Sequence, residues 1–442
     1  SKMNEGKRWG IIGGGFLGMT LALRLAQGGH KVTIFEAAPQ PGGLASSWEM
    51  DGVTWDRFYH VILMSDLNTR KIISELGLEK DFRWVETKTG FYSGGKLYSM
   101  SNLIEFFRFP PMNLIDKFRL GLTIFVASKI RDWRRLERLP VSEWLIRWSG
   151  KRVFEKIWLP LLKAKLGENY RDTSAAFIWT TIQRMYAARK SGLKKEMFGY
   201  VRGGYDRVNK RFAEHLQELG VSFHFSTKVK EVRKTGPSKL TITTEKGATE
   251  EFHHVISTLP SRLSVEIAQG LTDKEREQHR SIRYLGVICP TLLLKKAISP
   301  YYVTNITDTW PPFTGIIEMT ALIDKKEVGD KNMVYLPKYV NPDDPLFEAS
   351  EEQLRGTFIQ SLLKMYPHLK EDDILFWGVS KARLVLALPT LNYSQELPGI
   401  RTSLENYYIV NGAQIINGTL NINETIQVAE TKLEEIIDEQ EI

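Results

Sequence analysis

The sequence contains a single cysteine, Cys289, among 442 residues. One cysteine cannot form an internal disulfide, so a disulfide-stapled secreted domain is excluded and a reducing compartment fits the chain. No stretch reaches the roughly 18 uncharged apolar residues that a membrane-spanning helix needs. Residues 4–8 also lead into the first expected strand without an apolar signal segment. We therefore expect a cytoplasmic protein.

Motifs for metal and nucleophile chemistry are absent as well. The histidines lack the spacing of metal ligands, apart from the adjacent His253 and His254. There is no H-E-x-x-H, C-x-x-C or G-x-S-x-G pattern. We expect no metal site.

The net charge of +8 is concentrated in one segment. Residues 103–159 carry 12 Lys and Arg against 6 Asp and Glu, interleaved with Phe and Trp. Two interpretations of this segment stay open. The aromatic residues form the core of a helical insert and the charges its solvated face, or the segment is an anchor in peripheral contact with an anionic membrane surface.

The first 36 residues predict a strand, a glycine-rich turn, a helix and a second strand. Residues 9–12 read as a buried strand, residues 19–27 as a helix and residues 31–35 as the next strand, which Glu36 closes. The glycines of the turn are Gly13, Gly15 and Gly18, with the spacing G-x-G-x-x-G. This context is what the dinucleotide-binding fingerprint requires.

Each part of this fingerprint has a physical role. Gly13 permits the tight turn, Gly15 lets the backbone approach a pyrophosphate, and Gly18 lets the helix pack on the strand. The helix N-terminus offers N–H groups and a positive dipole to the phosphates. Glu36 is placed to bond a ribose 2′-OH, and its charge disfavours the 2′-phosphate of NADP.

The residues after Glu36 favour FAD over NAD. Pro41, Gly42, Gly43 and Leu44 follow at the distance at which the flavin amine oxidoreductase superfamily carries a Gly-Gly doublet. Here the sequence resembles that superfamily, which includes monoamine oxidases, protoporphyrinogen oxidases, phytoene-type desaturases and UDP-galactopyranose mutases. Amine oxidases usually have arginine after the doublet. This chain has Leu44, as some protoporphyrinogen oxidase-like and mutase-like members do.

The resemblance implies an α/β fold with a discontinuous Rossmann-type FAD-binding domain, a mixed α+β substrate domain and a helical insert. The FAD-binding parts are expected at residues 7–62, 199–262 and 396–442. The substrate domain is expected at residues 63–198, which include the insert, and 263–395. FAD is expected to be non-covalent, because Cys289 lies far from the C-terminal segment where amine oxidases attach it.

The residues expected to contact FAD come from all three parts of the nucleotide domain. From the first part they are Gly13, Gly14, Gly15, Phe16, Leu17, Gly18, Phe35, Glu36, Ala37, Gly42, Gly43 and Leu44, and from the other two Val229, Thr258, Gly412, Ala413 and Ile422. At Gly412-Ala413 the superfamily carries Gly-Asp, so the acidic flavin ligand is missing here. The run 417–424 resembles an uncharacterised, bacterial-type FAD-dependent oxidoreductase branch.

The resemblance implies an oxidoreductase that oxidises an organic small molecule by hydride transfer to flavin, with no nucleic-acid partner. The candidate catalytic residues are Tyr59, His60, Glu318 and Arg383, and Tyr335 and Tyr339 are further candidates for the flavin face. His60 is the candidate general base. Two alternatives stay open: a non-redox enzyme like UDP-galactopyranose mutase that acts on a sugar nucleotide, and an FAD-binding protein without turnover.

Overall fold

Five parallel strands from three separate parts of the chain form the first sheet. Their order is β10 (Ser222–His224), β2 (Lys31–Phe35), β1 (Arg8–Ile12), β14 (His254–Ser257) and β21 (Tyr407–Ile409). The structure, a computed structural model, describes residues 6–190, 197–416 and 419–440. Asn417 and Gly418 of the run 417–424 therefore lie outside the described residues.

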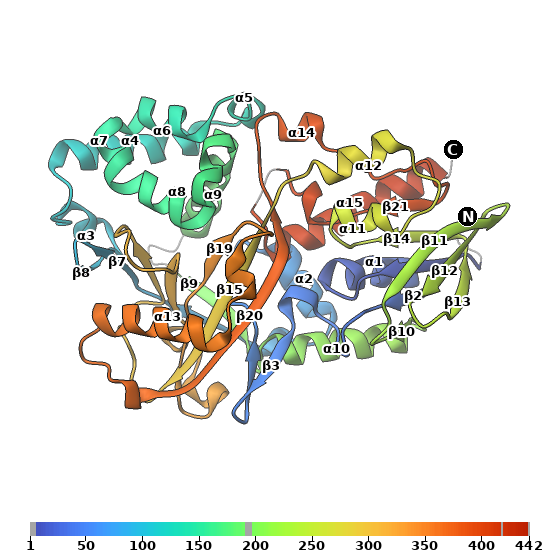
Figure 1. Cartoon of the computed structure of the whole chain (residues 1–442), viewed down its shortest axis with the longest axis horizontal. Helices are drawn as coiled ribbons and strands as arrows, with labels where there is room; N and C mark the ends of the chain where they lie inside the picture. Colours follow the sequence, from blue (N-terminus) through green and yellow to red (C-terminus); the bar gives the residue numbers. More distant parts are fainter. Residues whose placement is uncertain (1–5, 191–196, 417–418, 441–442) are drawn as a thin grey trace.

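Elements on both faces complete this nucleotide region, on the right of Figure 1. On one face α1 (Phe16–Gln27), α2 (Leu67–Glu75), α10 (Gly204–Glu218) and α15 (Ile422–Gln440) share a buried apolar core with the sheet. The other face packs against a small antiparallel sheet of β11 (Val229–Gly236), β12 (Lys239–Thr244) and β13 (Thr249–Phe252). Helices α11 (Ser261–Glu266) and α12 (Asp273–Arg280) follow β14.

An eight-stranded sheet forms the second region. Its order is β19 (Lys338–Val340), β15 (Tyr284–Leu294), β18 (Asn332–Tyr335), β17 (Gly315–Glu318), β16 (Val303–Ile306), β7 (Thr89–Ser93) and β8 (Lys96–Ser99), and β20 (Ile374–Ala387) pairs with β15. Helix α13 (Glu351–Met365) covers one face. The other face packs on β3 (Ser47–Met50), β4 (Val53–Asp56) and the segment that follows them.

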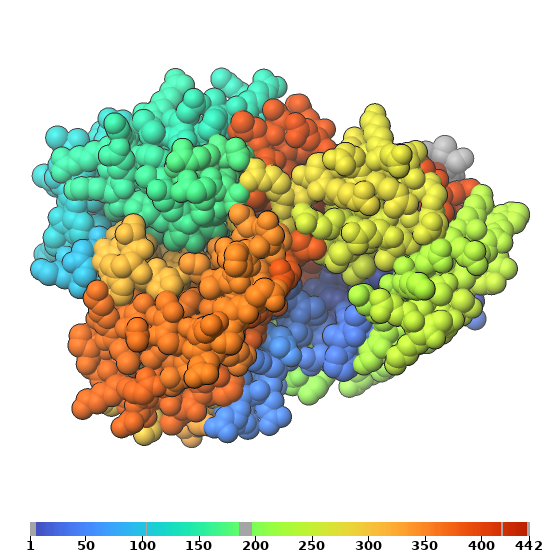
Figure 2. Space-filling model, in the orientation of Figure 1, coloured from blue at the N-terminus to red at the C-terminus, as the bar shows by residue number. Residues whose placement is uncertain are grey.

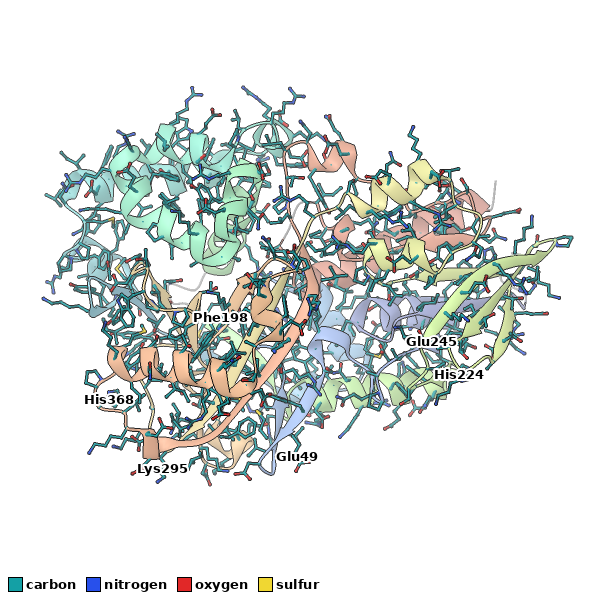
Figure 3. All side chains as sticks on the ribbon, viewed as in Figure 1. Glu49, Phe198, His224, Glu245, Lys295 and His368 are labelled. Atoms are coloured by element: carbon teal, nitrogen blue, oxygen red, sulfur yellow. The ribbon has the colours of Figure 1, made fainter. Side chains whose placement is uncertain are left out.

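Shorter elements join the two regions. Strands β5 (Ile62–Leu63), β9 (Met197–Val201) and β6 (Phe82–Glu86) form a three-stranded sheet, and α14 (Tyr393–Glu396) follows β20. Figure 3 shows the span of the molecule: His224 and Glu245 lie at the nucleotide end, Phe198 lies near the middle, and Lys295 and His368 lie at the other end.

The helical insert, which contains the basic segment, lies above the second sheet, in teal and green in Figures 1 and 2. It consists of α3 (Leu103–Phe107), α4 (Leu114–Lys129), α5 (Trp133–Leu136), α6 (Val141–Ser149), α7 (Lys151–Val153), a π-helical turn (Phe154–Trp158), α8 (Leu159–Leu166) and α9 (Ala175–Lys190). Its core contains Phe109, Trp144 and Trp158. Other aromatic residues of the same segment, such as Phe118 and Phe125, are exposed.

The expected fold class is confirmed, and the element boundaries differ little from the predicted ones. The first helix begins at Phe16, three residues before the predicted start, because Gly15 serves as its N-cap. No helix within the described ranges is both long and apolar enough to cross a membrane.

Candidate functional site

The turn between β1 and α1 is packed so tightly that two of its glycines cannot be replaced without a clash. Gly13 has a φ of +109°, and a Cβ there would lie 2.1 Å from Thr258 Oγ1. A Cβ on Gly18 would lie 2.0 Å from the carbonyl oxygen of Gly13. A Cβ on Gly15, in contrast, would meet nothing closer than 3.6 Å. A methyl group at position 15 would therefore fit in ordinary contact with the backbone of Gly42 and Gly43.

The first turn of α1 fits a phosphate group. No described side chain caps this helix at Gly15, so its N-terminal N–H groups remain available to an anion. The side chains of Phe16 and Leu17 are buried in the core, so these residues can serve a ligand only through their backbone. The turn therefore forms a backbone cradle that fits an anionic group such as a phosphate.

Glu36 lies at the end of β2 beside this turn. Its Oε1 accepts a hydrogen bond from Gly14 N at 2.8 Å and its Oε2 one from Ala38 N at 2.8 Å. Phe35, the residue before it, accepts a bond from Gly13 N at 2.8 Å through its carbonyl oxygen. The carboxylate is thereby fixed at the turn, and its remaining lone pairs are free to accept bonds from ribose hydroxyls. Ala37, which follows, is exposed.

The Gly-Gly doublet packs directly on the turn. Gly42 N donates to Gly14 O at 2.9 Å, and a Cβ on Gly43 would lie 3.2 Å from Gly15 Cα. A Cβ on Gly42 would also clash with Asn209 of α10, at 2.4 Å from its Nδ2. Leu44 is 37% exposed beside the doublet. Two glycine-rich segments thus approach each other with only backbone between them.

The second part of the nucleotide region contributes Val229 and Thr258. Thr258 Oγ1 donates to Ile12 O at 2.7 Å and stands against Gly13. Val229 is buried at the start of β11 in a cluster with Ile12 and Phe35. The turn before it crosses the end of β2, since Thr227 N donates to Glu36 O at 2.9 Å. Both residues therefore lie beside the predicted nucleotide site.

The C-terminal part differs from the superfamily pattern at Gly412-Ala413. The side chain of Ala413 is buried, its N–H donates to Asn411 Oδ1 at 2.9 Å, and its carbonyl oxygen accepts from the Tyr393 hydroxyl at 2.5 Å. The polar backbone groups of Ala413 are thus engaged within the protein. Gly412 and Ile422, the first residue of α15, keep part of their surface open.

Three candidate tyrosines meet on the face of the second sheet that looks away from α13. The hydroxyls of Tyr59 and Tyr339 are 2.8 Å apart, and the rings of Tyr59 and Tyr335 have centroids 5.9 Å apart. Tyr335 donates to Asp56 O at 2.7 Å. Burial raises the pKa of both Tyr59 and Tyr339 above the usual value, so both hydroxyls stay protonated and can donate hydrogen bonds.

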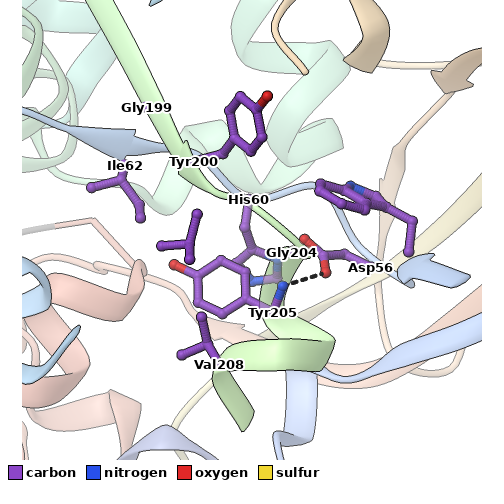
Figure 4. Close-up of a pocket in the computed structure, with 10 residues that line it drawn as sticks. Asp56, His60, Ile62, Gly199, Tyr200, Gly204, Tyr205 and Val208 are labelled. Carbon is purple, nitrogen blue, oxygen red and sulfur yellow. Dashed lines mark hydrogen bonds between the residues drawn. The ribbon is translucent and has the colours of Figure 1, made fainter. Parts of the chain in front are cut away.

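His60 is turned toward the N-terminus of α10 (Figure 4). Its ring lies 5.3 Å from that of Tyr205, and its Nδ1 is 2.7 Å from Phe58 O, to which it donates. Burial lowers the pKa of His60 to about 4, so the imidazole is neutral near pH 7. The hollow that it lines with Asp56 and Tyr205 has a volume of about 10 Å³, which holds a single water at most.

Glu318 does not join the tyrosines. It lies opposite Val334 in the β17–β18 ladder, and Val334 packs in the core under α13, whereas Ile317 and Tyr335 pack on the other face. Because successive strand residues point to opposite faces, Glu318 faces α13. It accepts bonds from Ile298 N at 3.1 Å and Thr320 Oγ1 at 2.6 Å.

Arg383 is separate again, on β20 at a groove between the two regions. It donates to Glu348 at 2.6 Å and to Pro342 O at 2.8 Å. The groove has a volume of about 650 Å³ and runs between the yellow α11 and the orange β20 in Figure 2. Arg262 lines the same groove, and its Nε has no hydrogen-bond partner among the described residues.

Sequence reasoning missed a charged group near the N-terminus of α15. Arg184 of α9 donates to both oxygens of Asp66, at 2.8 and 3.2 Å. Burial raises the pKa of Glu424, in the first turn of α15, while the charge of Arg184 opposes this shift. These residues are far apart in the chain and belong to no local motif, so no sequence signal indicated them.

Known proteins share this architecture. A family model, flavin containing amine oxidoreductase, matches residues 18–379. The chain belongs to this family. It is 26% identical over 249 residues to a zeta-carotene desaturase of Synechocystis sp., covering 51% of this chain and 50% of that protein. It is 26% identical over 165 residues to protoporphyrinogen oxidase 2 of Arabidopsis thaliana, covering 36% and 32%. The chain thus spans about half the length, or less, of these relatives.

Solved structures match over nearly the whole chain. Putrescine oxidase bound to putrescine superposes with a TM-score of 0.73 at 17% identity, covering 98% of this chain and 99% of that one. Reduced UDP-galactopyranose mutase gives 0.75 at 16% identity, covering 98% and 94%. An oxidoreductase from Methanosarcina mazei gives 0.75 at 16% identity, covering 97% and 100%. At such identities the likeness concerns the fold.

Family membership supports an FAD-dependent oxidoreductase. The residues present fit this cofactor, because the α1 turn, Glu36 and the Gly-Gly doublet form a cradle that added Cβ atoms would fill. Cys289 is buried inside β15.

Proposed function

We propose that the protein oxidises an organic small molecule by hydride transfer to FAD. The observation that carries the proposal is the backbone cradle in which Gly42 N bonds Gly14 O at 2.9 Å beside an uncapped α1. Glycines 13–18, Glu36 and the Gly42-Gly43 doublet would hold the nucleotide half, with Phe35, Ala37, Leu44, Val229 and Thr258 around it. Gly412, Ala413 and Ile422 would border the flavin half.

Bound FAD would supply the chemistry by accepting a hydride from the substrate. The chain's own residues would orient the substrate and shield it from water. The Tyr59–Tyr339 hydroxyl pair, 2.8 Å apart, is suited to donate a hydrogen bond to a substrate heteroatom. His60, neutral near pH 7 and donating through Nδ1 to Phe58 O, keeps Nε2 as an acceptor. Arg383 would contact a ligand in the groove that it lines. Glu318 faces α13, on the opposite side of the sheet from the tyrosines, and would take no part.

We also propose that the enzyme works in the cytoplasm on a small-molecule substrate, without a nucleic-acid partner and in peripheral contact with an anionic membrane surface. The basic, aromatic-rich insert supports the membrane contact. Helical interfacial segments combine these residue types.

Anaerobic reduction tests the redox proposal without knowledge of the electron acceptor. The FAD-loaded protein is mixed with panels of amines, porphyrinogens and polyenes, and loss of flavin absorbance is followed by stopped flow. We expect one class to bleach the flavin. Tyr339→Phe should slow this reduction about tenfold or more, as loss of a positioned transition-state hydrogen bond does. Tyr366→Phe, a buried tyrosine in the core under α13, is the matched control.

One observation favours a non-redox alternative like UDP-galactopyranose mutase. Arg262 and Arg383 both line the groove, and guanidinium groups bind phosphates well. Under this alternative, only reduced protein converts a sugar nucleotide and no substrate bleaches the flavin. If the flavin can be photoreduced but the protein converts no substrate of either class, the chain is an FAD-binding protein without turnover.

A further inference from the structure

The outer side of helix α4 is apolar where a helix at a protein surface is normally polar. The inner side packs Leu120, Thr123 and Ala127 into the insert, together with Asp116 and Lys117. The opposite side carries Ile115, Phe118 and Phe125, which are 73%, 70% and 60% exposed. Their spacing of three and seven residues puts them in one stripe along the helix.

Helix α3 extends this apolar surface. Ile104 and Phe107 on α3 and Leu114 at the start of α4 are 64%, 53% and 74% exposed. The Lys117 ammonium donates to Phe107 O, which ties the two helices together. We call the six residues Ile104, Phe107, Leu114, Ile115, Phe118 and Phe125 the α3–α4 face. Exposed apolar patches of this kind mark interaction sites.

The exposed charges around the face are mainly positive. Both acids of these two helices are engaged: Asp116 is buried and pairs with Arg152 at 3.6 Å, and Glu105 bonds Asn102 at 2.9 Å. The exposed charges are Arg108, next to Phe107, and Lys129, whose ammonium lies 5.5 Å from the Phe125 ring centroid. Arg131, Arg134 and Arg135 follow, also exposed, with the exposed Asp132 among them.

The face is rigid enough to act as a unit. Asn113 and Asp116 form a capping box that fixes the start of α4, and Lys156 donates to Pro111 O at 3.1 Å in the α3–α4 connection. Arg119 donates to Trp148 O of α6 at 3.1 Å. In Figure 1 both helices lie at the end of the molecule opposite β11–β13, so docking there leaves the nucleotide region clear.

We propose that the α3–α4 face docks on an anionic membrane surface, with Ile115, Phe118 and Phe125 inserted among the acyl chains and Arg108 and Lys129 beside the lipid phosphates. An apolar stripe flanked by cations matches the two layers that a bilayer presents. The proposal assigns the membrane contact to the α3–α4 face. It depends on neither FAD binding nor turnover.

Vesicle cosedimentation of the FAD-loaded protein tests the proposal. The vesicles are phosphatidylcholine alone or phosphatidylcholine with about 30% phosphatidylserine, at low ionic strength and at about 0.5 M salt. We expect binding to the anionic vesicles that falls with salt. The variant I115S/F118S/F125S should lower the partition coefficient about tenfold or more. The variant R108Q/K129Q should weaken binding at low salt only.

A matched control separates docking from general loss of apolar surface. The variant L67S/L219S/L375S removes exposed leucines elsewhere, with exposures of 66%, 39% and 38%, and should bind vesicles like the wild type. Retained FAD absorbance and helical circular dichroism show that each variant is folded. The proposal is overturned if anionic vesicles are not bound, if binding ignores phosphatidylserine, or if the stripe variant binds normally. It is equally overturned if the protein does not bind vesicles and sedimentation without lipid shows a dimer that only the stripe variant disrupts. The α3–α4 face would then be a dimer interface.

Discussion

Burial, more than charged partners, sets the protonation of three side chains in this protein. It raises the pKa of Asp56 to about 8 and that of Glu318 to about 7, and it lowers the pKa of His60 to about 4. In each case the neutral form is favoured, because a charge loses hydration in the interior and gains no ion pair in return. The surroundings of each of these three side chains therefore disfavour charge despite their polar atoms.

Glu318 gives this argument a measurable consequence. Its folded pKa of about 7 lies above that of an unfolded glutamate, so the folded state binds more protons between roughly pH 4.5 and 7. The free energy of unfolding should therefore fall as the pH rises through this window, by on the order of 3 kcal/mol. Glu318→Gln cannot ionise and should lack this loss. Urea unfolding at pH 5 and pH 8 measures both.

At pH 8 the Gln variant should be the more stable protein, and at pH 5 the two should be close. Glu352→Gln, at an exposed position on α13, is the control and should follow the wild type. Parallel stability curves for wild type and Glu318→Gln would contradict the assignment of Glu318 as a buried neutral acid.

At the scale of elements, the sequence predicted helices, strands and turns that depend on neighbouring residues. It did not predict side-chain directions and contacts that depend on how distant segments pair. Strand, turn, helix and strand over residues 8–35 follow from glycine spacing and short apolar runs. The directions of Glu318 and His60 do not. Glu318 faces α13 because of the register of β17 on β18, and His60 turns toward Tyr205 within an irregular segment. The ion pair of Arg184 with Asp66 joins two residues that are 118 positions apart in the chain.

Two glycines of the β1–α1 turn should respond differently to substitution: Gly18 is needed for packing, and Gly15 is proposed to make room for the ligand. Gly18→Ala places a Cβ 2.0 Å from Gly13 O, and this overlap should destabilise the apoprotein by about 1–3 kcal/mol. Gly15→Ala meets no atom closer than 3.6 Å and should cost the fold at most about 1 kcal/mol. The Gly15→Ala variant should nevertheless bind FAD about tenfold more weakly or worse, because the added methyl group would occupy space needed by the pyrophosphate.

Urea unfolding of the apoproteins and titration of FAD fluorescence measure these two effects separately. A Gly15→Ala variant that binds FAD like the wild type would mean that the pyrophosphate lies elsewhere. A Gly18→Ala variant as stable as the wild type would mean that α1 can move away from the turn at little cost.

At the scale of the whole molecule, the proposed FAD site draws on residues 13–44, 229–258 and 412–422, so a ligand that spans it connects three distant parts of the chain. The α3–α4 face, the proposed membrane contact, lies on the helical insert at the other end (Figure 1). The second sheet and the tyrosine group lie between them. This arrangement would let one end bind the nucleotide while the other contacts a membrane surface.

Because the site spans three parts of the chain, FAD should stabilise the protein more than FMN does. Ligand at about 100 times its dissociation constant adds about 2.7 kcal/mol to the free energy of unfolding. FMN lacks the adenosine half that Glu36 and Val229 would hold, so it should raise the Tm less at equal concentration. NADPH should give no shift, since its 2′-phosphate meets the Glu36 carboxylate. Thermal unfolding with each ligand tests this order.

The variant Glu36→Ala tests whether the adenosine half of FAD causes the larger rise in Tm with FAD than with FMN. Loss of charge-assisted bonds to ribose should weaken FAD by about 1.5–3 kcal/mol, while FMN, which makes no such bonds, should keep most of its effect. The Tm advantage of FAD over FMN should then shrink in this variant and persist in the control Glu49→Ala, at an exposed position on β3. Equal shifts by FAD and FMN in the wild-type protein would contradict a ribose role for Glu36, and an undiminished advantage in Glu36→Ala would place the adenosine half away from the end of β2.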